Sequence, residues 1–63
     1  MEGTMIHLAD GTRINAFRSP FYGWIAVHYR KGLEGEEIAR RGNRRDLLDA
    51  VGRYMRDNGY EMA

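Results

Sequence analysis

Alternating apolar and polar positions near the start of the chain predict two short β-strands joined by a tight turn. The two runs cover residues 4–8 and 12–17. Between them lies Asp10-Gly11, a dipeptide that is typical of β-hairpin turns. The sequence therefore predicts a hairpin at this point of the chain.

The length of the hairpin loop decides which side chains share a face of the sheet. A two-residue loop would place apolar residues of the first strand on the same face as Arg13 and Asn15. A three-residue loop that ends at Gly11, in the left-handed conformation that glycine adopts freely, gathers the apolar residues instead. We therefore predict this loop, which pairs Leu8 with Thr12 and Ile6 with Ile14 and forms an apolar face of Ile6, Leu8, Ile14 and Ala16.

Residues 22–30 predict the third and strongest strand. The connection before it contains Pro20, which lacks the N–H group that a sheet ladder needs. The two faces of this strand carry Ile25, Val27 and Tyr29 on one side, and Trp24, Ala26, His28 and Arg30 on the other. Because the first set is the more apolar, we predict that it faces the core.

A short fourth strand is predicted over residues 36–41, centred on Ile38 and preceded by a loop over residues 31–35. The flanking glycines and the shortness of the run favour a strand. A helix over residues 34–41 is the alternative that the sequence leaves open.

The clearest pattern in the chain is an amphipathic helix over residues 44–58. Asn43 precedes it as an N-cap, and Asp46 is placed three residues on, as in a capping box. The helix carries an apolar stripe of Leu47, Leu48, Val51 and Met55, and a charged face of Arg45, Asp49, Arg53 and Asp57.

The end of the helix is marked by Gly59, which we expect in the left-handed cap position, with Tyr60 folding back on Met55. Residues 61–63 are expected to fray. Gly52 lies inside the helix, where glycine costs about 1 kcal/mol relative to alanine. Close approach of a strand or of a second chain would explain a glycine there.

Together these elements predict an α+β fold, a small antiparallel meander sheet of three to four strands with one C-terminal helix packed on one face. The 63 residues form a single domain, 1–63. Without cysteine the chain has no disulfide, so we expect a well-packed monomer or a homodimer. No apolar run reaches the ~20 residues of a membrane span, and residues 1–4 lack a signal-peptide pattern, so we expect a cytoplasmic protein.

Few residues could support catalysis. Ser19 precedes a proline and has no histidine beside it in the sequence, and Lys31 falls in a loop that cannot desolvate it. His7 and His28 lie on the first and third strands, roughly 9–10 Å apart by the inter-strand spacing, which is too far for one metal ion. No phosphate-binding glycine motif occurs. We therefore expect no enzyme, no cofactor and no metal.

Two surfaces are candidates for binding. The first is the sheet face opposite the helix, where aromatic rings and arginines would suit nucleic-acid bases and phosphates or a protein partner. An exposed tryptophan on so small a chain is costly unless it is used or covered. In the predicted register this face carries His7, Arg13, Asn15, Phe17, Trp24, His28, Arg30 and Arg41.

The second candidate is the basic run at the junction of the fourth strand and the helix, which contains Arg40, Arg41, Arg44 and Arg45. Two of these arginines fall in the first helical turn, where the helix dipole disfavours cations. An anion or a carboxylate of a partner would offset that cost. The alternative is a solvated turn whose arginines pair with neighbouring acidic residues.

The stretch from the third strand to the helix resembles, in topology alone, the three-strands-plus-helix domains of phage integrases and plant AP2 factors. The resemblance implies a nucleic-acid-binding sheet. The net charge of +1, from ten basic and nine acidic residues, argues mildly against that function. A small cysteine-free chain with balanced charge is also similar to phage accessory proteins, anti-CRISPR inhibitors among them. We therefore expect a non-enzymatic protein that binds a host protein or ribonucleoprotein, with nucleic-acid binding as the alternative.

Overall fold

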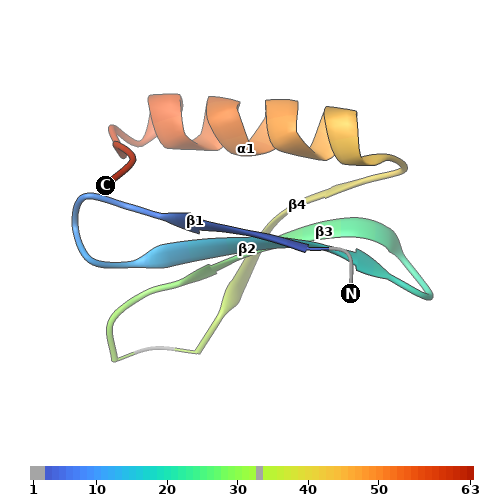
Figure 1. Cartoon of the computed structure of the whole chain (residues 1–63), viewed down its shortest axis with the longest axis horizontal. Coiled ribbons are helices and arrows are strands. Elements are labelled where there is room, and N and C mark those ends of the chain that lie inside the picture. Colours follow the sequence, from blue (N-terminus) through green and yellow to red (C-terminus); the bar gives the residue numbers. More distant parts are fainter. Residues whose placement is uncertain (1–2, 33) are drawn as a thin grey trace.

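The computed structural model describes residues 3–32 and 34–63 and shows a four-stranded antiparallel sheet with one helix packed on it (Figure 1). Met1, Glu2 and Leu33 lie outside the described residues. The sheet is a meander of order β1-β2-β3-β4, and the predicted α+β fold is confirmed. Its elements are β1 (Gly3–His7), β2 (Arg13–Ser19), β3 (Gly23–Tyr29), β4 (Glu36–Arg41) and α1 (Arg44–Asp57).

The register of the first hairpin is the predicted one. Ile6 pairs with Ile14, and the Leu8 N–H donates to the Thr12 carbonyl at 2.9 Å. Gly11 has φ +89°, in the left-handed region that favours glycine. Its N–H closes the turn by donating to the Leu8 carbonyl at 3.0 Å. The three-residue loop therefore places the apolar side chains of both strands on one face.

The prediction for the faces of β3 was wrong. Ala26 pairs with Ala16 and His28 pairs with Ile14, so these two residues of β3 face the helix with the apolar side of β2. Both are fully buried. The opposite, helix-free side of the sheet instead carries Ile25, Val27 and Tyr29, next to Phe17 and Asn15. The prediction chose the face with more apolar residues. It failed because the core face of β3 contains His28, whose two ring nitrogens both have hydrogen-bond partners.

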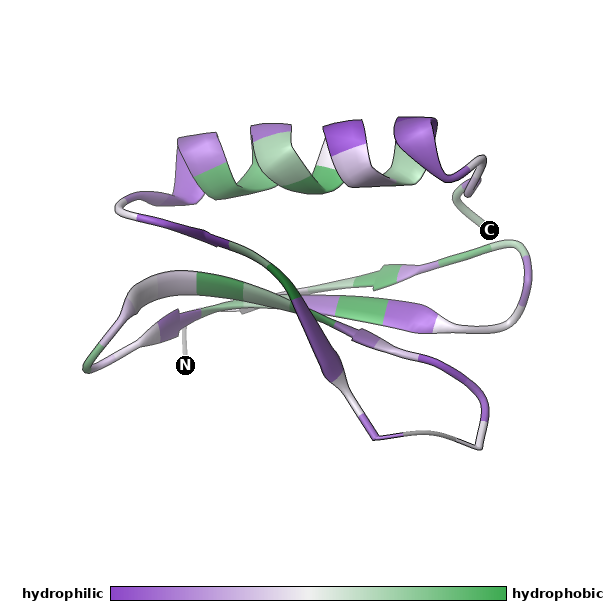
Figure 2. Ribbon diagram, turned by 180° about the vertical axis from the view of Figure 1, so that it is seen from behind, coloured by the Kyte–Doolittle hydropathy of each residue, from purple (hydrophilic) through white to green (hydrophobic). Residues whose placement is uncertain are grey.

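The segment 36–41 is a strand, as predicted, and it contains a β-bulge. The register with β3 shifts between Ala26 and Val27, which leaves Ile38 as the extra residue. Ile38 packs against the core. Just before the strand, Gly35 lies under the ring of Tyr29, where an added Cβ would come within 2.7 Å of a ring carbon. Bulges increase local twist, and β4 crosses the sheet steeply (Figure 2).

Helix α1 begins and ends at the predicted caps. The Asn43 side chain accepts a hydrogen bond from the Asp46 N–H at 2.8 Å. The return bond runs from the Asn43 side-chain amide to the Asp46 carboxylate at 3.1 Å, rather than from the Asn43 backbone as in a capping box. At the other end, Gly59 donates to Arg56 and Tyr60 donates to the Met55 carbonyl at 2.8 Å. These two bonds form a Schellman motif.

The core lies between α1 and the sheet. The apolar side of the helix faces the strands and its charged side faces solvent (Figure 2). Trp24 and Ile38 are among the partly buried residues around the core. The fully or nearly fully buried cluster consists of Leu8, Ile14, Ala16, Ala26, Leu47 and Val51. Within the part of the chain that the structure describes, no helix has the length and apolar character needed to cross a membrane.

The prediction that residues 61–63 fray was wrong. Met62 forms an isolated antiparallel bridge with Leu8. The Ala9 N–H donates to the Glu61 carbonyl at 2.7 Å, and the Ala63 N–H donates to the His7 carbonyl at 2.8 Å. The tail therefore extends the sheet beyond β1 over three residues of that edge.

Two glycines should respond in opposite ways to replacement by alanine. Gly23 has φ +77°, and a Cβ there would lie 2.9 Å from the Arg41 carbonyl oxygen, so Gly23→Ala should cost about 1–3 kcal/mol. Gly52 is exposed, and among the described residues nothing lies near the position of an added Cβ, so no described strand approaches it closely. Gly52→Ala should therefore stabilise the fold by about 0.4–1 kcal/mol. Urea denaturation of both variants measures the change in the free energy of unfolding. If both substitutions stabilise the fold, or both destabilise it, one of these two readings of the glycines is wrong.

Candidate functional site

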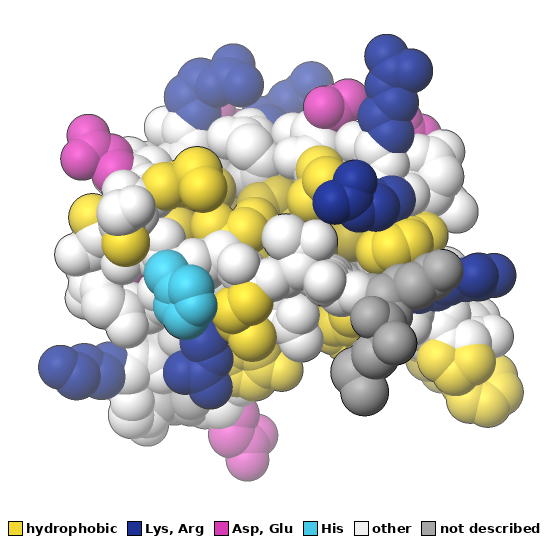
Figure 3. Space-filling model, in the orientation of Figure 1, with side chains coloured by type: hydrophobic (Ala, Val, Ile, Leu, Met, Phe, Trp, Pro, Cys, Tyr) yellow, Lys and Arg dark blue, Asp and Glu magenta, His cyan; other side chains and the backbone are white. Residues whose placement is uncertain are grey.

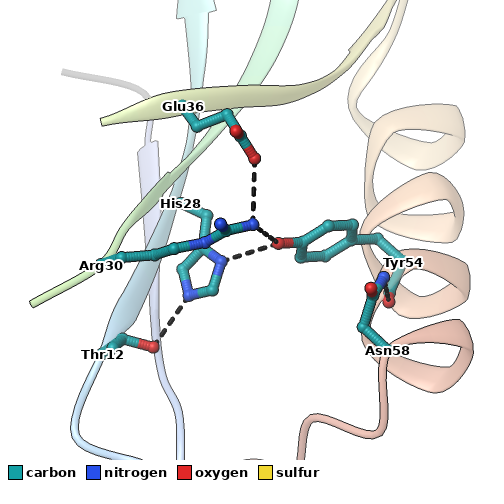
Figure 4. A network of polar contacts seen from close by, with 6 residues as sticks. All are labelled: Thr12, His28, Arg30, Glu36, Tyr54 and Asn58. Carbon is teal, nitrogen blue, oxygen red and sulfur yellow. Dashed lines mark hydrogen bonds and ion pairs between the residues drawn. The ribbon is translucent and has the colours of Figure 1, made fainter. Parts of the chain in front are cut away.

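A chain of polar groups links the helix to the sheet around His28 (Figure 4). His28 is fully buried, and both of its ring nitrogens are bonded. Nε2 lies 2.8 Å from the Thr12 hydroxyl, and Nδ1 lies 2.8 Å from the Tyr54 hydroxyl. Arg30 donates to the same Tyr54 oxygen at 3.3 Å and to Glu36 at 3.0 Å. The network therefore joins β3, β4, α1 and the first hairpin turn.

The directions of these hydrogen bonds match a neutral His28. The Thr12 hydroxyl donates its only proton to the Asp10 carboxylate at 2.6 Å, so it must accept from Nε2–H of His28. Arg30 donates to the Tyr54 oxygen, and the Tyr54 proton can point at Nδ1. A neutral His28 with its proton on Nε2 satisfies all of these contacts. In this form the hydrogen bonds from Arg30 through Tyr54, His28 and Thr12 to Asp10 run in one direction, and Arg30 also donates to Glu36.

The surroundings of His28 favour this neutral form. Burial lowers the pKa of His28, and the nearby Arg30 cation lowers it further. The carboxylates of Asp10 and Glu36 oppose the shift without cancelling it. The Tyr54 and Tyr60 rings pack edge-on against the imidazole, with centroids 5.7 and 5.0 Å away. The network holds the two layers together and leaves His28 inaccessible to a partner.

The exposed chemistry of the molecule lies elsewhere, at the turn between β2 and β3. Phe21 is 85% exposed and Tyr22 is 58% exposed. Their rings make an edge contact with centroids 6.4 Å apart. Large apolar side chains seldom protrude this far from a small domain without a role, because they lose the benefit of burial. The sequence analysis placed Phe21 in a connection and Tyr22 at the start of the third strand, whereas β3 begins at Gly23.

The turn itself is held in a defined shape. The buried Ser19 hydroxyl accepts hydrogen bonds from the N–H groups of Phe21 and Tyr22, both at 3.3 Å. Pro20 restricts the backbone between them. Gly23 ends the turn in the left-handed region, beside the Arg41 carbonyl. The signal was present in the sequence, since aromatic residues enclosed by Ser-Pro and Gly belong to a turn and cannot reach the core.

Arg40 connects the aromatic turn to the basic run. Its guanidinium lies over the Tyr22 ring at 4.6 Å from the centroid, and it pairs with Glu37 at 2.8 Å. Arg41 donates to the Arg40 carbonyl at 2.7 Å. Cation–π contact and ion pairing both hold the Arg40 side chain against the sheet. The aromatic turn and the basic run therefore meet at one end of the molecule.

We call this region the hairpin-end surface and define it by Phe21, Tyr22, Arg40, Arg41 and Arg44. Arg44 reaches from the first turn of α1 to the Thr4 hydroxyl of β1 at 3.5 Å. Figure 3 shows apolar side chains protruding beside Lys and Arg side chains at the right-hand end, where Figure 1 places the β2–β3 turn. Arg41 also lines a shallow depression on the exposed side of α1, together with Asp46, Asp49, Ala50 and Arg53.

The other predicted site residues are dispersed. Trp24 lies on the helix side of the sheet against the core, and Arg41 is its cross-strand neighbour. His28 and Arg30 belong to the network under the helix. The predicted open face therefore lacks all four of these residues. It does carry His7, Arg13, Asn15 and Phe17.

Arg13 lies towards the other end of the sheet from the hairpin-end surface. Its guanidinium covers the Tyr29 ring at 5.1 Å from the centroid. Arg45 is exposed in the first helical turn, as expected from the sequence. His7 pairs with Arg13 on the open face whereas His28 faces the helix, so the two histidines lie on opposite sides of the sheet. In residues 3–32 and 34–63, no group of three or more His, Cys, Asp or Glu side chains could hold a metal ion.

No protein-family model, curated protein or solved structure matches the chain. The observed sheet has four strands, one more than the three-strands-plus-helix domains to which the sequence was compared. Function has to be argued from the exposed chemistry of the chain itself. That chemistry is concentrated on the hairpin-end surface.

The buried neutral His28 should make the fold sensitive to mild acid. Its pKa in the fold is lower than 6.5, so below pH ~6.5 the unfolded chain binds the proton more readily and the free energy of unfolding falls. His28→Gln should lower stability at neutral pH and flatten this loss between pH 7 and pH 5. Urea denaturation at both pH values measures it.

The matched control for this test is His7→Gln, because His7 is exposed on the open face. This variant should keep the acid-dependent loss of the native chain. Asp10, whose pKa is lowered by its bonds to Thr12, contributes in the same direction but only in the lower range where carboxylates titrate. An unchanged slope in His28→Gln would contradict the assignment of a neutral buried histidine.

Proposed function

We propose that this chain is a non-enzymatic binding protein that recognises a protein, or the protein part of a ribonucleoprotein, through the hairpin-end surface. The observation that carries the proposal is the pair of exposed aromatic rings on a turn fixed by Ser19 and Gly23. Tyrosine, other aromatic residues and arginine are the usual anchors of protein interfaces. A turn already held in shape loses little conformational entropy on binding.

The distribution of charge favours a protein partner over nucleic acid. Acidic groups are interleaved with the arginines of this end: Glu37 pairs with Arg40, and Asp46 and Asp49 line the depression with Arg41. Phosphates would be repelled by these carboxylates, whereas a protein surface can match a mixed pattern. The nucleic-acid hypothesis for the sheet face also relied on Trp24 and His28, and both lie on the helix side of the sheet, Trp24 partly and His28 fully buried.

Binding of this kind acts by occupying a surface of the partner. A chain of this size can cover one functional patch of a larger complex, and the outcome is then inhibition. A phage or mobile-element inhibitor of a host complex, of the anti-CRISPR kind, is the form of the proposal that we favour. The arginines would then meet acidic groups around the pocket that receives Phe21.

The exposed ring of Phe21 should contribute strongly to partner affinity and little to folding. Phe21→Ser should weaken binding of a partner captured from host lysate by about 2 kcal/mol or more, roughly 30-fold. Its urea midpoint should stay close to that of the native chain, since the side chain is exposed. Titration of the purified partner by calorimetry measures the affinity.

Matched variants separate this surface from general effects of charge and composition. Phe21→Tyr keeps the ring and should keep binding. Arg44→Glu should weaken binding, whereas Arg56→Glu, an equal charge change in the last turn of α1, should not. If Phe21→Ser and Arg44→Glu bind as tightly as the native chain, the hairpin-end surface is not the contact.

The nucleic-acid alternative is tested by gel mobility of short DNA and RNA, single- and double-stranded, at two salt concentrations. We expect no shift from the native chain at either salt. A shift that weakens steeply with salt would indicate phosphate contacts and would replace the proposal above.

A further inference from the structure

The outer edge of β1 carries backbone groups that point away from the sheet. The Leu8 N–H donates inward to Thr12, whereas the Ala9 N–H donates outward to Glu61. Directions alternate along an antiparallel strand, so the N–H and C=O groups of Met5 point outward, like the His7 carbonyl that accepts from Ala63. Within residues 3–32 and 34–63, no strand pairs with the outer side of Met5.

This stretch of edge has none of the usual protection against strand addition. Residues 3–6 read Gly-Thr-Met-Ile, without charge or proline, and they pair regularly with β2. Met5 is 45% exposed. The edge at β4 differs, because it carries a bulge and four charged residues among its six. Natural edge strands that are not meant to pair are protected in this second way.

The tail of the chain shows that the β1 edge accepts an antiparallel strand. Met62 bridges to Leu8, and two backbone hydrogen bonds flank the bridge. This pairing covers residues 7–9 and stops there. A strand in line with the tail would meet Met5 next, with its neighbouring residues opposite Ile6 and Thr4.

The positive charge of Arg44 beside the β1 edge favours an acidic residue on a strand that pairs there. The Arg44 guanidinium lies 3.5 Å from the Thr4 hydroxyl, on the helix side of the edge. A residue opposite Thr4 on an added strand would point to the same side. Self-pairing of two β1 strands about Thr4 would bring two Arg44 side chains together, which disfavours a second copy. An acidic side chain at that position would instead pair with Arg44.

We propose that the outer edge of β1 at residues 3–6 binds an extended antiparallel segment of the partner protein, with an acidic side chain opposite Thr4. This deepens the proposed function and rests on it for the identity of the partner as a protein. Arg44 belongs to the hairpin-end surface, and Gly3 pairs with Phe17 in the same half of the sheet. A partner held at the aromatic turn therefore finds the free edge next to it, and binds by β-strand addition.

The edge can be tested without the partner by extending the tail. Appending Val-Thr-Glu-Thr after Ala63 continues the register of the Leu8–Met62 bridge, so the second added residue lies opposite Met5 and the third opposite Thr4. The probe is held at high effective concentration because it is covalently attached. The readout is amide hydrogen exchange at Met5, measured by NMR on the full chain.

We expect the Met5 amide to exchange at least about tenfold more slowly in the extended chain than in the native chain. A version with proline as the second added residue should exchange like the native chain, because it loses a donor. A version with lysine as the third should protect Met5 less than the glutamate version, and Arg44→Gln should remove that difference. Circular dichroism of each chain checks that the fold is retained.

Three results would overturn the inference. Equal Met5 exchange in the glutamate-extended and native chains would show that the edge does not accept a strand. Equal protection of Met5 by the glutamate and lysine versions would contradict the preference for an acidic side chain opposite Thr4. Protection of Met5 in the native chain that rises with protein concentration would assign the edge to a second copy. None of these measurements involves Phe21, so loss of the proposed function through that residue is distinguished from loss of the strand site.

Discussion

The burial of a neutral histidine between the sheet and the helix fixes how the two layers of this protein meet. An imidazole removed from water needs a partner for each ring nitrogen, and an unpaired buried polar atom is costly. Thr12 and Tyr54 supply both partners, from the hairpin turn and from the helix. Because Asp10 and Arg30 orient the hydroxyls of these two residues, the helix has one rotation and one height over the sheet at which the bonds all form.

The position of His28 also determines which side chains β3 presents on the face opposite the helix. Once His28 and its strand neighbours Ala26 and Trp24 face the helix, the opposite side of β3 must present Ile25, Val27 and Tyr29. Much of this second face is covered by its own surroundings: Gly35 lies under Tyr29, and Ile25 is only 7% exposed. The large aromatic side chains that are exposed, Phe21 and Tyr22, lie at the β2–β3 turn and not on the sheet face. The proposed binding surface is therefore at this turn.

Local patterns in the sequence were enough to predict the elements, the first hairpin and the helix caps. Each depends on neighbouring residues: the left-handed Gly11, the Asn43 cap and the Gly59 Schellman turn act within a few positions. The face of β3 could not be predicted in this way. It depends on pairing with β2 across the turn, and on hydrogen bonds that make a buried histidine as acceptable in a core as an aliphatic residue.

The candidate site was predicted only in part, because local patterns show its arginines but not which residues the fold places beside them. The arginines at the β4–α1 junction are visible as a run in the sequence, and all four are exposed. That this run lies beside the aromatic turn is a consequence of the meander, which places the start of β3 against the end of β4. The tail was missed because its pairing with β1 joins the two extremes of the described chain.

The meander has a further consequence for how the chain reaches this structure. Every strand pairs with its immediate successor, so each step of sheet formation closes a short loop and costs little chain entropy. Topologies dominated by such local contacts fold quickly. The bridge between Leu8 and Met62 joins residues that are far apart in the sequence. Forming it therefore costs the most chain entropy, in return for only two backbone hydrogen bonds. The edge of the sheet is therefore the last part to form and the first to open.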